Sequence, residues 1–295
     1  MKSKSILLSS IVFGTFILSS FTLAFFTFAQ GSKSPPIEFK EVVETRLLNI
    51  YRTNLKKICP VDSDPTAERI FKEYGAIFVS NGTMLPTKCI FTDDEELQNY
   101  QVRIKTESAI VGGVPVQLQK PAMEALLNAQ KEAASKKITI TPRGGSLAAK
   151  RSFKDTVGLW NSRFLPGLNY WVGRKKLTAK QAADIKKSDI KQQVEQVLEW
   201  EDEGLFFSKD FSKSILFSVA APGASQHNFM LALDVEQFAD KEVRKILAAN
   251  GWFQTVKSDL PHFTYLGLKE SELPNLGLMP VTVGSQKFWI PNYAD

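Results

Sequence analysis

The chain has only two histidines, and each stands near a carboxylate. His227 precedes Asp234 by seven residues, and Asp259 precedes His262 by three. Imidazole nitrogens and carboxylate oxygens bind zinc, and a catalytic zinc uses three protein ligands and leaves one position open for water. We therefore expect His227, Asp234 and His262 to hold Zn²⁺, with Asp259 as general base. The alternative is that each histidine is structural and only hydrogen-bonds to a carboxylate.

The local sequence must place these side chains together. Residues 231–235 and 262–266 are strand-like, and Gly223 follows a proline in a segment typical of a tight turn. Residues seven apart face opposite sides of a continuous strand, so a bend must lie between His227 and Asp234 if both bind one ion. A turn at residues 260–261 would aim Asp259 at the water.

The order of these residues resembles the zinc site of the LAS-type peptidases, in the D-alanyl-D-alanine carboxypeptidase branch (VanY-like). That family carries Ser-x-His with Gly three and Asp seven residues after the His, and later Glu-x-x-His-x-x-Tyr-x-Gly. Met230 stands here in place of the Gly, and Asp259 in place of the Glu. The similarity extends over roughly residues 117–267. The matching residues are Ser225, His227, Ala232 and Asp234 in the first motif, and His262, Tyr265 and Gly267 in the second.

The resemblance implies an activity and a role for each site residue. His227, Asp234 and His262 would bind zinc, and Asp259 would activate water and then protonate the leaving amine. An arginine would hold the substrate carboxylate or the developing oxyanion, and Arg151 and Arg143 are both candidates. Either arginine could instead be a surface charge.

The implied function is that of a zinc-dependent peptidase, a carboxypeptidase or an endopeptidase, that cleaves peptidoglycan stem peptides. One alternative is a catalytically silent zinc-binding module that holds wall peptides or a partner protein. Another is a purely structural envelope protein in which the histidines only pack. Metal content separates the last alternative from the other two, and peptide cleavage separates the first two.

Charge and the N-terminal sequence indicate where the protein acts. The net charge of +6 is spread over lysine patches, which are typical of solvated faces or of attraction to an anionic surface. No basic helix or base-stacking motif indicates nucleic-acid binding. Lys2 and Lys4 precede an uncharged apolar run over residues 6–29, which predicts a signal peptide or an N-terminal membrane anchor. We therefore expect an exported protein, in the periplasm or on the outer face of a bacterial cell membrane.

An exported chain with two cysteines, Cys59 and Cys89, favours a disulfide over two buried thiols. Such a bridge would lie in an N-terminal extension, residues 31–116, between the signal or anchor at 1–30 and a peptidase-like domain at 117–295. The oligomeric state is left open.

Periodicity and turn residues predict an α+β fold, with a central, mostly antiparallel sheet flanked by helices. The resemblance implies a LAS/hedgehog-like domain. We expect a hairpin over residues 99–116 and a loop at 166–172. The expected helices lie at residues 37–57, 65–74, from 121, from 153 through 160, from 179, 189–203 and 240–250, and the further strands at 76–79, from 89, 138–141 and 215–219.

Overall fold

The computed structural model describes residues 37–293, all within one compact unit. The expected signal or anchor and the linker that follows it lie outside the described residues. Among the residues that are described, no helix is long and apolar enough to cross a membrane. The extension up to residue 116 packs in the same unit as the region that carries the site, and the boundary expected after it stays a prediction.

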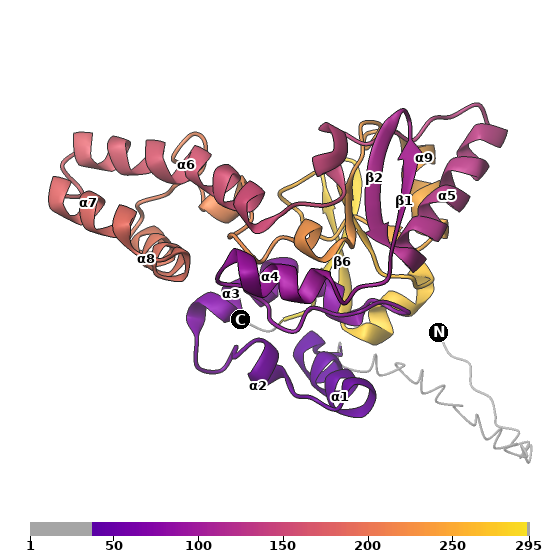
Figure 1. Cartoon of the computed structure of the whole chain (residues 1–295), viewed down its shortest axis with the longest axis horizontal. Helices are drawn as coiled ribbons and strands as arrows, with labels where there is room; N and C mark the ends of the chain where they lie inside the picture. The colour runs from indigo at the N-terminus through magenta and orange to yellow at the C-terminus, as the bar shows by residue number, and fades with distance from the viewer. Residues whose placement is uncertain (1–36, 294–295) are drawn as a thin grey trace, which may run out of the picture. The chain divides into compact units, whose positions relative to one another are not determined.

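The fold is α+β, as the sequence predicts, and its pairings are antiparallel (Figure 1). The expected hairpin forms, with Gly112 and Gly113 in its turn, but it covers residues 106–119 rather than 99–116, because residues 94–101 form a helix. The sheet that carries the site is small, with strand order β3-β5-β4. The strands are β1 (Thr106–Val111), β2 (Val114–Gln119), β3 (Ala232–Asp234), β4 (Trp252–Phe253), β5 (His262–Tyr265), β6 (Leu278–Val283) and β7 (Gln286–Pro291).

The N-terminal extension is mostly helical. Asp64 caps α3 by accepting a hydrogen bond from the Ala67 N–H, and Pro65 occupies the first turn, where its missing N–H costs nothing. The expected disulfide between Cys59 and Cys89 is present, with Cα atoms 5.2 Å apart, and it ties the end of α2 to the loop before α4. The helices of this region are α1 (Phe39–Tyr51), α2 (Leu55–Ile58), α3 (Pro65–Tyr74) and α4 (Asp94–Gln101).

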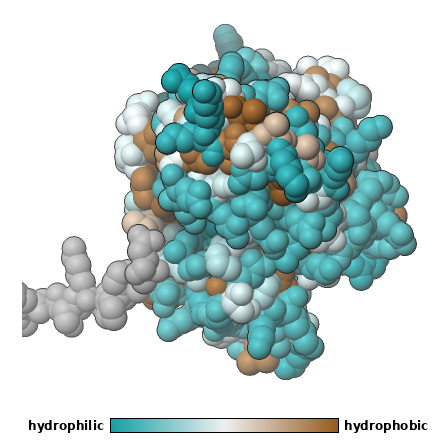
Figure 2. Space-filling view, turned by 90° about the vertical axis from the view of Figure 1, so that its left-hand side faces the viewer, coloured by the Kyte–Doolittle hydropathy of each residue, from teal (hydrophilic) through white to brown (hydrophobic). Residues whose placement is uncertain are grey.

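Of the remaining helices, α5 and α9 pack on strands, whereas α7 packs against α6 and α8 packs against α7. Helix α6 begins at Ser152, whose hydroxyl and the Asp155 carboxylate form a capping box. In Figure 1, α6, α7 and α8 lie together, apart from the strands, and the face on their side is mostly hydrophilic in Figure 2. These helices are α5 (Lys120–Ser135), α6 (Phe153–Gly173), α7 (Ala179–Lys187), α8 (Ile190–Asp202) and α9 (Lys241–Ala249).

Several local predictions are wrong, mainly at short apolar runs. A buried apolar run of four to five residues suits a strand or a helical turn equally well, and here tertiary packing decides. The run at 76–79 lies in the 3₁₀ helix η1 (Gly75–Val79), and most of the run at 215–219 lies in η3 (Ile215–Phe217). Residues 89–91 and 138–141 form no strand, although neighbouring Pro142 makes one bridge to Val235.

The segment expected to be an aromatic loop, residues 166–172, continues α6 past Pro166. Helix α8 begins after Asp189, whose side chain caps it by accepting a hydrogen bond from the Gln192 N–H. The sequence did not predict α4, β4, β6 or β7. The short 3₁₀ helices η2 (Gly145–Ala148), η4 (Gln226–Phe229) and η5 (Glu270–Leu276) complete the fold.

Candidate metal centre

The loop before β3 is fixed by a close backbone contact at Gly223. Its φ is +75°, and a Cβ there would lie 2.0 Å from the Phe91 carbonyl oxygen, so only glycine fits. The Phe91 N–H donates to the Gly223 carbonyl oxygen at 3.1 Å. Helix η4 follows, and Met230 then adopts a left-handed conformation with φ 54°. This turn provides the bend that the sequence requires between His227 and Asp234.

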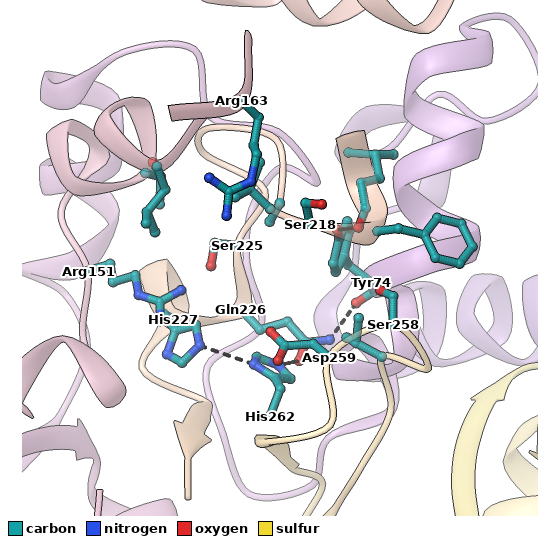
Figure 3. A pocket seen from close by; sticks show the side chains of 17 residues that line it. Tyr74, Arg151, Arg163, Ser218, Ser225, Gln226, His227, Ser258, Asp259 and His262 are labelled. Atoms are coloured by element: carbon teal, nitrogen blue, oxygen red, sulfur yellow. Dashed lines mark hydrogen bonds between the residues drawn. The ribbon is translucent and has the colours of Figure 1, made fainter. Parts of the chain in front are cut away.

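Strand pairing and this bend bring three side chains to one point. Asp234 at the end of β3 pairs with His262 at the start of β5, and His227 reaches them from η4. His227 Nε2 lies 3.1 Å from His262 Nδ1, and each of these nitrogens lies 3.3 Å from Asp234 Oδ1 (Figure 3 shows the two imidazoles). All three residues are buried, and together they form a group that could hold a metal ion.

The size of this triangle fits zinc. Bonds of about 2.0–2.1 Å at tetrahedral angles separate neighbouring ligand atoms by roughly 3.3–3.4 Å. The three separations of 3.1, 3.3 and 3.3 Å are close to that value. Two nitrogens and one oxygen are also a donor set found in catalytic zinc sites with one open position.

The protonation states of His227 and Asp234 in the folded protein favour metal binding. Burial lowers the pKa of His227 to about 4, so its imidazole is neutral near pH 7. Burial alone would raise the pKa of Asp234, but the His227 and His262 imidazoles beside it hold that pKa well below its ordinary range. A neutral imidazole and an ionised carboxylate are the forms that bind a metal.

The structure separates the two candidate arginines. Arg151 Nη2 donates to Asp234 Oδ2 at 2.6 Å, which leaves Oδ1 facing the histidines, and Arg151 also lines the cavity beside them. Arg143 lies on the surface, paired with Glu236 at 3.2 Å and placed over the Phe238 ring. It is not among the residues that line this cavity.

A cavity of about 230 Å³ opens beside the two histidines. That volume is below the roughly 300–1,000 Å³ of sites for drug-sized ligands, so it suits a small part of a larger substrate. Asp259 lines it together with His227 and His262 and is exposed on the cavity side (Figure 3). Partial burial raises the pKa of Asp259, and this effect is larger than the opposing effect of His262. The Asp234 carboxylate raises the pKa further.

Sequence reasoning missed three residues at this site: Arg163, Tyr74 and Gln226. Arg163 points from α6 into the cavity (Figure 3). Its spacing from Thr156 and Leu159, which also line the cavity, places the three on one helix face. That signal was readable, but the helix was expected to end before it. Tyr74 comes from the N-terminal extension, and no local pattern links it to the site.

No protein-family model and no curated protein matches the sequence. Two solved structures are similar in fold. One is VanYB in complex with D-alanine-D-alanine, with 14% identity and a TM-score of 0.34, covering 59% of this chain and 86% of that chain. The other is a mutant of the vancomycin resistance D,D-pentapeptidase VanY in complex with Zn(II), with 15% identity and a TM-score of 0.31, covering 57% of this chain and 82% of that chain.

Proposed function

We propose that this protein is a zinc-dependent peptidase that cleaves peptidoglycan stem peptides. The observation that carries the proposal is the triangle formed by His227, Asp234 and His262 at zinc-ligand spacing, open to a cavity that Asp259 also lines. A purely structural role for the histidines accounts less well for three buried ligand atoms that converge beside a cavity.

The side chains of the site have separate roles in the proposed reaction. Zinc held in such a site supplies Lewis-acid chemistry, because it activates water and polarises a carbonyl. The Asp259 carboxylate accepts the proton from the attacking water and delivers it to the leaving amine. Arg151 holds Asp234 by one nitrogen, which keeps the ligand oxygen in place.

Two guanidinium groups give the cavity its affinity for an anionic substrate group. Arg151 lines the cavity on the side of the histidines, and Arg163 lines it from α6. Arg163 Nη1 donates to the Ser162 hydroxyl and carbonyl oxygens, and the guanidinium points into the cavity (Figure 3). A carboxylate at the end of a peptide is a suitable acceptor for a guanidinium that faces the cavity. We propose that the enzyme is exported and acts at the cell wall.

Substitution of Asp259 tests the mechanism. Asp259→Asn keeps the shape of the side chain and removes the base, so muropeptide cleavage falls by about 10²–10⁴-fold while one zinc remains bound. Asp202→Asn is the matched control, because Asp202 is an exposed aspartate at the end of α8, outside the cavity, and it leaves cleavage unchanged. Full cleavage by Asp259→Asn with zinc bound would show that Asp259 is not the base.

The second candidate is a zinc-binding module without catalysis. One feature favours it: the base position holds aspartate, whose carboxylate reaches one methylene less far than glutamate, and small misplacements cost large factors in rate. Wild-type protein that binds zinc and muropeptides but cleaves none of them would support this reading over the peptidase.

A further inference from the structure

The outer nitrogen of His262 contacts a buried side chain that the motif does not include. His262 Nε2 lies 2.8 Å from Gln226 Oε1, on the side of the ring opposite the metal-facing Nδ1. Gln226 is 1% exposed, and it is the residue immediately before His227. In η4, His227 is therefore one proposed ligand, and its neighbour Gln226 contacts the other histidine ligand, His262.

The orientation of the Gln226 amide is fixed by its other contact. Gln226 Nε2 donates to the Tyr74 backbone carbonyl oxygen at 2.9 Å, and a carbonyl can only accept. The amide oxygen must therefore face His262. This oxygen also accepts from the Thr264 hydroxyl, which in turn accepts from the Thr255 hydroxyl at 2.6 Å. Thr264 and Thr255 are fully buried, so the network is closed to water.

This geometry decides which nitrogen of His262 carries the proton. An amide oxygen can only accept, so Nε2 must bear the hydrogen and Nδ1 keeps its lone pair toward Asp234 and His227. Without Gln226, the Asp234 oxygen 3.3 Å from Nδ1 would attract the proton to that nitrogen. A protonated Nδ1 cannot bind a metal until the proton leaves.

We propose that Gln226, held by the Tyr74 carbonyl, is a positioning residue that fixes His262 as the Nε2–H tautomer and so presets Nδ1 as a metal ligand. This rests on the proposed metal site. It also joins the N-terminal extension to the site, because Tyr74 ends α3. His227 has no such support, since its Nδ1 is buried without a partner in the described part of the chain.

The test combines a tautomer measurement with a zinc affinity. Imidazole ¹⁵N shifts of the metal-free protein give the tautomer directly, and two histidines make assignment simple, with His227→Asn identifying each signal. Wild type shows His262 as Nε2–H. Gln226→Leu shifts His262 toward Nδ1–H and weakens zinc binding by about 10–100-fold in a chelator competition. Gln193→Leu is the control for loss of a buried glutamine. It removes one hydrogen bond from Gln193, on α8, to the Ser188 carbonyl at the end of α7, and it leaves the His262 tautomer and the zinc affinity unchanged.

A second variant separates tautomer control from packing. Gln226→Glu keeps an acceptor for His262 but loses the donor to Tyr74, so it retains the Nε2–H tautomer and binds zinc more tightly than Gln226→Leu. The inference is overturned if Gln226→Leu keeps both the tautomer and the wild-type affinity. It is also overturned if Gln226→Glu loses zinc as fully as the leucine variant does. Absence of zinc binding by wild type would instead refute the metal site, while the tautomer of the metal-free protein would still test the contact.

Discussion

At the scale of single residues, Asp259 carries the largest consequence for the reaction. Its pKa is raised by partial enclosure and by the Asp234 carboxylate, against the opposing effect of His262. In the metal-free protein the Asp259 carboxyl therefore titrates above the ordinary aspartate value of about 3.9, and its ionised form, the base, is lost as the pH falls through the raised pKa. Side-chain carboxyl ¹³C shifts of the metal-free protein measure this pKa, with Asp259→Asn to identify the signal. Titration at the ordinary aspartate value would contradict the raised pKa.

Arg163 is the residue that we expect to recognise the substrate terminus. Arg163→Gln removes the charge that faces the cavity, so KM rises for a peptide with a free terminal carboxylate. The same change has little effect on the amidated peptide. The comparison of the two substrates, with Arg143→Gln as the surface control, measures this. Equal effects of Arg163→Gln on the acid and the amide would exclude carboxylate recognition by this side chain.

At the scale of elements, the site depends on how the loop before β3 is anchored. Gly223→Ala places a Cβ 2.0 Å from the Phe91 carbonyl oxygen. This oxygen belongs to the backbone, so it cannot move away as the end of a flexible side chain could. Gly113→Ala is a matched control, because Gly113 has a similar φ of +83° but nothing lies within 4 Å of its Cβ position. The control costs about 1–2 kcal/mol of left-handed strain.

Gly223→Ala costs more than its control because it adds the clash to the same strain, and it weakens zinc binding because η4 must shift. Urea unfolding of both variants gives the difference in stability, and a chelator competition gives the zinc affinity. Equal losses of stability in the two variants would mean that the Phe91 contact does not hold the loop.

The sequence predicted the two strands that carry ligands, β3 and β5, and several of the helices that begin at a capping residue. Ser152 and Asp240 mark helix starts that form as expected, because capping is a local property of a few residues. The runs at 76–79 and 215–219 become 3₁₀ turns, because short apolar segments take the conformation that their packing allows. The ligand set could be proposed from two histidines and a motif. Gln226 and Tyr74 could not be paired, because their contact spans 152 residues.

At the scale of the whole molecule, the disulfide stabilises the region that contains α3. Cys59 and Cys89 are separated by 30 residues, and closing a loop of that length stabilises the folded state by about 2–4 kcal/mol in the chain-entropy model. The double variant Cys59→Ala/Cys89→Ala loses about this free energy of unfolding. Reduction of wild type gives a similar loss, whereas the same reductant leaves the double variant unchanged. Unaltered stability in both cases would contradict a stabilising bridge.

The central claim is that this chain holds one zinc ion through His227, Asp234 and His262, and metal content tests it most directly. Purified protein dialysed against zinc and measured by elemental analysis should contain one zinc per chain. His227→Ala, measured in the same way, should contain almost none. Wild-type protein without stoichiometric zinc, or a His227→Ala variant that retains it, would contradict the account.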